Sequence, residues 1–197
     1  MLLENYTRLD KNTIQNIEDV CEYTYNKCKP YFVKTRIALD IGCKKGGFAK
    51  HICKDFNHVH MFDMRPKMQW QHLNRGNCTL HKFAIGAANG IIKHSGALTN
   101  VIVDGIEMTT SPVKTIDSLN FECVDFIKID VEGDEEAVLQ GAKETLEKWK
   151  PVVVLEQNHT TEKYGKGKYG DAIRWLEDHK YKITDYDGMD DWIMTHV

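Results

Sequence analysis

Residues 37–47 read IALDIGCKKGG, and this stretch decides the fold class. Its first five residues form a short, mostly apolar run, which is typical of a strand buried on both faces of a parallel sheet. The glycines at positions 42, 46 and 47 end that strand, and residues 48–56 then predict a helix. A strand, a glycine-rich turn and a helix in succession indicate the first unit of a doubly wound α/β fold.

The same alternation continues along the chain. Further strands are expected at residues 58–63, 79–85, 124–131 and 152–156, and helices at residues 67–75, 134–149 and 171–179. Residues 181–186 and 192–197, joined through Asp187 and Gly188, are expected to pair as an antiparallel hairpin. Together these elements predict an α/β fold with a doubly wound, mostly parallel seven-stranded sheet of the Rossmann-like kind and a C-terminal antiparallel hairpin.

We expect residues 1–197 to form a single domain, since this length suits one hydrophobic core. Residues 1–35 are expected to be an N-terminal helical cover, with helical spacing over 12–29 and Pro30 at its end. Residues 87–111 interrupt the alternation. Their two apolar runs, 91–93 and 101–103, predict a hairpin or an irregular insert.

Composition limits the classes of function. The chain is 42% hydrophobic and 28% charged, with a formal net charge of −3, so it lacks the basic character of a dedicated nucleic-acid-binding protein. No apolar run approaches the roughly 20 residues that cross a bilayer, and the start of the chain does not resemble a secretory signal. The six cysteines include no C-x-x-C pair, which favours reduced thiols and a cytoplasmic location over disulfides or structural zinc.

The glycine-rich turn predicts a nucleoside cofactor. A dinucleotide-binding loop would carry a second glycine two residues after Gly42, but Lys44 stands there, so that fingerprint fails. The acid two residues before Gly42 instead suits S-adenosylmethionine, which has no phosphate and carries a cationic amino group and a sulfonium that a carboxylate attracts. The residues of this segment expected to contact the cofactor are Asp40, Gly42, Cys43, Lys45 and Gly46.

A second cofactor contact is expected at the end of the next strand. Asp63 follows Gly42 by one β-α-β interval, where an acid hydrogen-bonds a ribose diol in doubly wound sheets. Met64 lies beside it, and Ala84 and Ile85 are expected to form a small wall next to the adenine. The alternative is that Asp63 only caps the following helix.

The most specific signal is residues 124–135, VDFIKIDVEGDE, preceded by TIDSL at 115–119 and FAIG at 83–86 and followed by VLQGA at 138–142 and PVVVLE at 151–156. In these motifs the chain resembles the FkbM family of S-adenosylmethionine-dependent methyltransferases. The resemblance implies a class I methyltransferase fold, O-methylation of a hydroxyl, and a small-molecule or carbohydrate acceptor as partner. The chain departs from the family at Cys43-Lys44, where a small residue and Asn are usual, and at Asp63-Met64, where Glu-Pro is frequent.

The acceptor hydroxyl needs a base, and acids at the carboxyl edge of the sheet are the candidates. Asp130 ends the fourth strand and is expected to contact the cofactor or the acceptor. Glu132, Glu156 and His159 are further catalytic candidates, although Glu132 could simply stabilise a helix N-terminus and His159 could be solvated. Lys128 shares a strand face with Asp130 and is expected to pair with an acid. Asp130, Glu156 and His159 could also hold a divalent metal, but we predict no metal site.

Two alternatives stay open at this point. The chain could be a non-catalytic protein that keeps the methyltransferase fold, or it could act on RNA through a basic groove leading to Asp130. The sequence leaves its oligomeric state undetermined.

Overall fold

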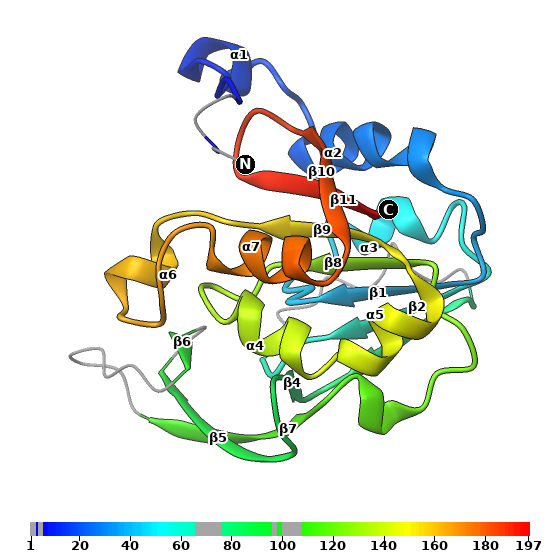
Figure 1. The fold of residues 1–197 in the computed structure, drawn as a ribbon, viewed down its shortest axis with the longest axis vertical. Helices are drawn as coiled ribbons and strands as arrows, with labels where there is room; N and C mark the ends of the chain where they lie inside the picture. Colours follow the sequence, from blue (N-terminus) through cyan, green and yellow to red (C-terminus); the bar gives the residue numbers. More distant parts are fainter. Residues whose placement is uncertain (1–2, 4–5, 66–75, 96–97, 100–107) are drawn as a thin grey trace.

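The computed structural model describes residues 3, 6–65, 76–95, 98–99 and 108–197. Its larger sheet has seven strands and lies at the centre of the fold (Figure 1). Its strands are β1 (Ile37–Ile41), β2 (His58–Phe62), β3 (Cys78–His81), β8 (Phe126–Ile129), β9 (Val152–Glu156), β10 (Tyr181–Tyr186) and β11 (Asp191–His196). The order is β10-β11-β9-β8-β1-β2-β3. Strands β1, β2, β3, β8 and β9 are parallel to one another. Strand β11 is antiparallel to both of its neighbours, β9 and β10. The predicted mostly parallel sheet with a C-terminal hairpin is therefore confirmed.

Helices cover both faces of this sheet (Figure 1). The helices are α1 (Lys11–Gln15), α2 (Val20–Cys28), α3 (Ala49–Ile52), α4 (Glu135–Gln140), α5 (Lys143–Trp149), α6 (Thr160–Lys163) and α7 (Asp171–Asp178), with short 3-10 turns at Lys29–Tyr31 and Asp117–Leu119. Leu39 and Ile41 pack in the core on the side of α4, α5 and α7, whereas Ala38 packs on the side of α2 and α3. Each strand side chain points to the face opposite its neighbour's, so an apolar strand fills both cores.

The helix predicted over 134–149 is divided into α4 and α5 at Gly141. A Cβ on Gly141 would lie 2.1 Å from the carbonyl oxygen of Gly86, so the chain approaches a neighbouring loop more closely than any side chain permits. The helices predicted over 12–29 and 48–56 are likewise shorter than expected, as the bounds of α1, α2 and α3 show.

The prediction of one continuous strand over residues 79–85 is wrong, because the structure has two separate strands there. β3 ends at His81, and β4 (Ala84–Ile85) belongs to a second sheet of order β4-β7-β5-β6, with β5 (Gly90–Ser95), β6 (Leu98–Thr99) and β7 (Thr109–Lys114). The expected insert is thus built around β5 and β7, which pair antiparallel. Residues 101–103 and the helix predicted at 67–75 lie outside the described residues.

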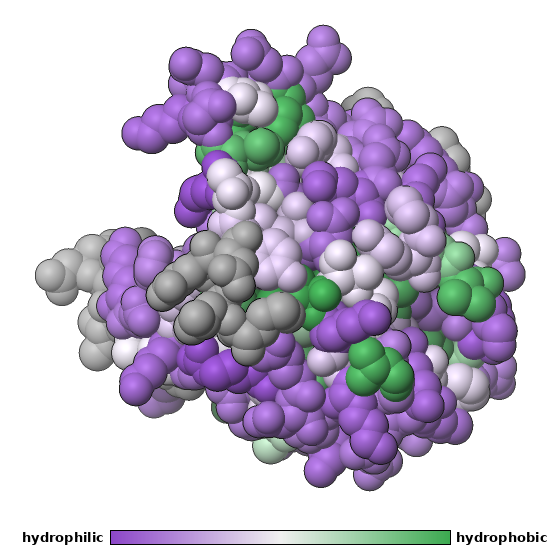
Figure 2. All heavy atoms as spheres, turned by 45° about the horizontal axis from the view of Figure 1, so that its top comes forward, coloured by the Kyte–Doolittle hydropathy of each residue, from purple (hydrophilic) through white to green (hydrophobic). Residues whose placement is uncertain are grey.

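The surface drawn in Figure 2 is mainly hydrophilic, with apolar residues in small separate patches. Through the described parts of the chain, no helix combines the length and the apolar character that a membrane span requires.

Candidate functional site

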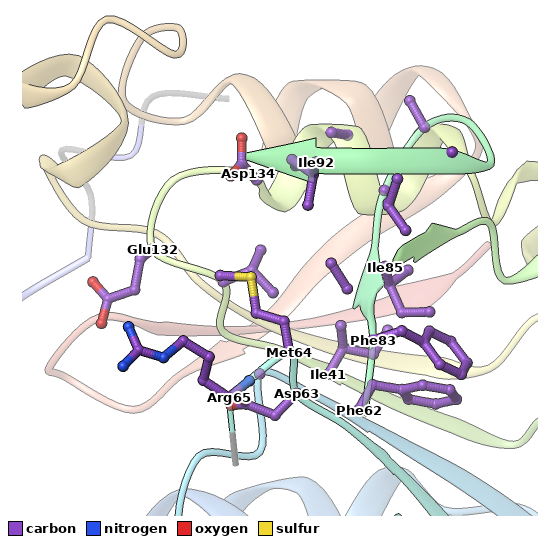
Figure 3. Close-up of a pocket in the computed structure, with 18 of the residues that line it drawn as sticks. Ile41, Phe62, Asp63, Met64, Arg65, Phe83, Ile85, Ile92, Glu132 and Asp134 are labelled. Atoms are coloured by element: carbon purple, nitrogen blue, oxygen red, sulfur yellow. The ribbon is translucent and has the colours of Figure 1, made fainter. Parts of the chain in front are cut away.

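A cavity of about 540 Å³ lies at the carboxyl ends of β1, β2 and β8, beside the second sheet (Figure 3). This edge is where parallel α/β sheets bind their ligands, and the volume falls in the usual range for small-molecule sites. Seven residues that the sequence singles out line it, namely Gly42, Asp63, Met64, Ala84, Ile85, Asp130 and Glu132. The structure therefore brings together residues from four separate segments of the chain.

The glycine-rich turn forms one side of the cavity. Gly42 has φ +83°, and a Cβ there would lie 1.7 Å from the carbonyl oxygen of Asp130, so no other residue fits this crossing of two strand ends. The backbone N–H groups of Gly42 and Cys43 both donate to the carbonyl oxygen of Phe62, at 2.8 and 3.1 Å. The turn is thereby fixed against the end of β2.

Asp63 holds the rim of the cavity in place. One carboxylate oxygen accepts a hydrogen bond from the backbone N–H of Lys44 at 2.9 Å, and the other accepts from that of Arg65 at 2.6 Å. Each carboxylate oxygen can accept more than one hydrogen bond, so Asp63 can still accept from a diol. The carboxylate thus links two loops and keeps capacity for a ligand.

The cavity has an apolar interior and a charged mouth (Figure 3). Phe62, Phe83 and Ile85 form its inner wall, and the rings of Phe62 and Phe83 lie 5.7 Å apart. At the mouth, Arg65 and Glu132 point toward one another (Figure 3). Such a site suits a ligand with one flat apolar end and one polar end.

Two acids organise the turn between β8 and α4. The buried carboxylate of Glu135 accepts a hydrogen bond from the backbone N–H of Gly133 at 2.9 Å, which fixes the turn carrying Asp130 and Glu132. Asp134 forms an ion pair of 2.6 Å with Lys166, whose ammonium also donates to the carbonyl oxygen of Glu132 at 3.3 Å. The loop at residues 164–169, which follows α6 and is rich in glycine and lysine, is therefore tied to the cavity mouth.

A cluster of charged side chains lies behind the cavity, on the face of the sheet that α2 and α3 cover. Strand register places Asp40 beside Lys128, and Asp191 beside Glu156. The ammonium of Lys128 lies 2.8 Å from a carboxylate oxygen of Asp191, and both side chains are largely buried. Glu156 in turn lies beside Asp130, because each follows a paired residue at the end of its strand. We refer to Asp40, Lys128, Asp130, Glu156 and Asp191 as the acid–lysine cluster.

Burial changes the protonation of this cluster. Burial alone would lower the pKa of Lys128, but the charges of Asp191 and Asp130 outweigh it and raise that pKa, so the lysine stays cationic. Burial raises the pKa of Asp40 to about 7 and that of Asp191 to about 6, in each case against the opposing effect of Lys128. Burial, together with the neighbouring carboxyl group of Asp130, raises the pKa of Glu156 to about 9.

Six of the predicted site residues do not line the cavity, namely Asp40, Cys43, Lys45, Gly46, Glu156 and His159. Asp40 is 2% exposed, and strand register places it beside Lys128. The His159 side chain is 77% exposed and pairs with Glu162 at 3.1 Å. The cofactor and catalytic roles of these residues stay predictions.

The structure also adds residues that sequence reasoning missed. Arg65, Phe83, Ile92 and Val113 line the cavity, and Asp191 is the ion-pair partner of Lys128. The position of Arg65, directly after Asp63-Met64, was the available signal for it, whereas Ile92 and Val113 depend on the second sheet. In the described part of the chain, no group of three or more His, Cys, Asp or Glu residues could hold a metal ion.

A family model described as the methyltransferase FkbM domain matches residues 40–183. Among solved structures, the chain is similar to a methyltransferase FkbM from Methylobacillus flagellatus KT, with TM-score 0.56 and 18% identity over 96% of this chain and 56% of that chain. It is also similar to a precorrin 8w decarboxylase from Methanobacterium thermoautotrophicum, with TM-score 0.52 and 15% identity over 96% of this chain and 97% of that chain. No curated protein matches the chain. At these identities the solved structures show a shared fold, and this chain spans 56% of the Methylobacillus protein.

Proposed function

Because the chain belongs to the FkbM family of methyltransferases, we propose that it uses S-adenosylmethionine to methylate a hydroxyl group of a sugar or other small metabolite. The strand order of the central sheet is that of class I methyltransferases, and the solved neighbours share this fold. When bound, the cofactor supplies a methyl group on a positively charged sulfur. The protein's own residues must then align the acceptor with that methyl group and take up the hydroxyl proton.

The observation that carries the cofactor proposal is the position of Asp63. Its carboxylate lines a cavity at the carboxyl edge, at the end of the strand next to the glycine-rich turn, and retains lone pairs for a ribose diol. The apolar wall of Phe83, Ala84 and Ile85 suits an adenine ring. Asp130 lies on the other side of the glycine turn, where a carboxylate would favour the cationic end of the cofactor.

The charges around the cavity support a neutral acceptor. Asp130, Glu132 and Asp134 all line the cavity. Lys44 and Arg65 line it too, and Lys166 pairs with Asp134, so charges of both signs offset one another at this entrance. A site without a surplus of positive charge gives a polyanion such as RNA little attraction and is compatible with an uncharged hydroxyl compound. Asp130 lies in the cavity itself and is our candidate base, in preference to the exposed His159.

Isothermal titration with S-adenosylhomocysteine tests the cofactor proposal. Asp63→Ala should weaken binding by about 1–3 kcal/mol, because a charged hydrogen bond to the ligand is lost and the Lys44 and Arg65 backbone loses its acceptor. Asp178→Ala, an exposed aspartate on α7, is the matched control and should leave affinity unchanged. Equal affinity for wild type and Asp63→Ala would remove Asp63 from the cofactor site.

A screen of sugars and other hydroxyl compounds with methyl-labelled S-adenosylmethionine tests the acceptor proposal. With an acceptor in hand, Asp130→Asn should lose turnover while it retains affinity for S-adenosylhomocysteine, because the amide keeps the shape but cannot accept the proton. Full turnover in this variant would exclude Asp130 as the base. Label transfer to RNA alone would refute the small-molecule proposal.

A further inference from the structure

The carboxyl groups of Glu156 and Asp130 are neighbours at the edge of the sheet, and the proximity of Asp130 raises the pKa of Glu156 beyond the effect of burial. Two ionised carboxylates have acceptors but no donor and repel one another, so such a pair favours a state in which one of the two is protonated. Strand register fixes this arrangement. Ile129 pairs with Leu155, so Asp130 and Glu156, which follow them, lie side by side at the carboxyl ends of β8 and β9. The pair is therefore built into the sheet.

The surroundings of the pair hold an excess of negative charge. Glu156 is faced by Asp130 and Lys128 from β8 and by Asp191 from β11, and Asp40 from β1 lies beside Lys128. Farther out, the buried acids Glu135 and Asp187 add to the same field at Asp130 and Asp191. One lysine thus stands among four carboxyl groups in its cluster, so at least one of them is readily protonated and readily responds to an added cation.

Of the five residues in the acid–lysine cluster, Asp130 lines the cavity. A positive charge that enters the cavity therefore acts most strongly on Asp130 and, through the electrostatic interaction between the two neighbouring carboxyl groups, on Glu156. A neutral ligand of the same shape exerts no such effect.

We propose that Asp130 and Glu156 are a proton-exchanging carboxyl pair that releases its shared proton when a cationic ligand fills the cavity and regains one from the acceptor hydroxyl. This inference rests on the proposed function, because the cation is the sulfonium of S-adenosylmethionine. On binding, the Glu156 carboxyl becomes a carboxylate and its proton goes to solvent. In the transfer, the acceptor oxygen forms a bond to the methyl carbon as the carbon–sulfur bond breaks with its electrons going to sulfur, and the hydroxyl proton passes to the pair.

The cycle balances over one turnover. One proton leaves the protein on cofactor binding, and the acceptor's proton restores the starting state, so the net release is the single proton that O-methylation must produce. Once the sulfonium has become a neutral thioether, the cluster again favours the protonated pair. Glu156 is in this view a positioning and proton-holding residue, and Asp130 is the group that touches the ligands.

Titration calorimetry in buffers with different ionisation enthalpies measures the proton exchange directly. Near pH 7, wild type should release more protons with S-adenosylmethionine than with S-adenosylhomocysteine, by an amount approaching about one per site. Glu156→Gln preserves the side-chain shape and can donate a hydrogen bond to Asp130 but cannot titrate, so the release on S-adenosylmethionine binding should fall by that amount. Glu147→Gln, at an exposed position on α5, is the matched control and should behave as wild type.

Each result has a definite meaning. Identical proton release in wild type and Glu156→Gln overturns the carboxyl-pair inference while leaving the cofactor proposal intact, whereas failure of both ligands to bind overturns both. The ligand's own amino group contributes equally in wild type and variant, so it cancels in their difference. If Glu156→Gln does not fold, infrared difference spectra of wild type decide: the inference requires a protonated-carboxyl band to disappear with S-adenosylmethionine and to persist with S-adenosylhomocysteine.

Discussion

Replacing Lys128 with Met tests the electrostatics of the acid–lysine cluster. The substitution keeps an unbranched side chain of similar length but removes the one cation among four carboxyl groups. Removing one partner of a buried ion pair costs about 3–5 kcal/mol, because the remaining charge is left uncompensated. For a chain of this size, each kcal/mol lowers Tm by about 2–4 °C, so a fall of about 6–20 °C is expected.

The loss should depend on pH. Asp40 and Asp191 have folded-state pKa values of about 7 and about 6, above their ordinary value, so the native state binds more protons than the unfolded chain in this range. Stability from these groups is therefore fully present below their unfolded pKa and declines as pH rises toward the folded values. Without Lys128, both pKa values rise further and the decline becomes steeper. Lys128→Met should thus cost more near about pH 8 than near about pH 5.5.

Urea unfolding followed by circular dichroism at these two pH values measures the free energy of unfolding. Lys143→Met, at an exposed position on α5, is the control and should change stability by no more than about 0.5 kcal/mol. A loss below about 1 kcal/mol at the higher pH would refute the assignment of Lys128 as the counter-ion of the cluster. An equal loss at both pH values would refute the protonation argument.

Two glycine substitutions test the close approaches at the cavity. Gly42→Ala should destabilise the protein by more than about 3 kcal/mol in thermal unfolding, since its Cβ would lie 1.7 Å from a backbone carbonyl oxygen. Gly76→Ala is the control, because Gly76 has a similar φ of +73° but nothing within 4 Å of the added Cβ. It should cost only about 1–2 kcal/mol. Comparable losses in the two variants would show that φ strain alone matters at position 42. Gly141→Ala would push on the carbonyl of Gly86, which lines the cavity, and should weaken S-adenosylhomocysteine binding by about tenfold or about 1.4 kcal/mol in calorimetry. Unchanged affinity with a reduced Tm would confine that contact to a structural role.

The sequence alone determined the elements whose signals are local. Apolar runs separated by a glycine turn predict β1 and its parallel neighbours because burial on both faces demands apolar side chains at every position. The closing hairpin followed from two β-rich runs around Asp187-Gly188. Motif positions at strand ends also placed Gly42, Asp63 and Asp130 near one cavity, because parallel strands bring their carboxyl ends to a single edge.

Only the tertiary structure decided which way the strand acids point and what they meet. Strand register places Asp40 beside Lys128, and that lysine finds its closest partner in Asp191, far along the chain. The strand predicted at 79–85 divides because Ala84 and Ile85 pair with β7 in another sheet. Such contacts depend on register and packing between distant segments, for which a local pattern carries no physical signal.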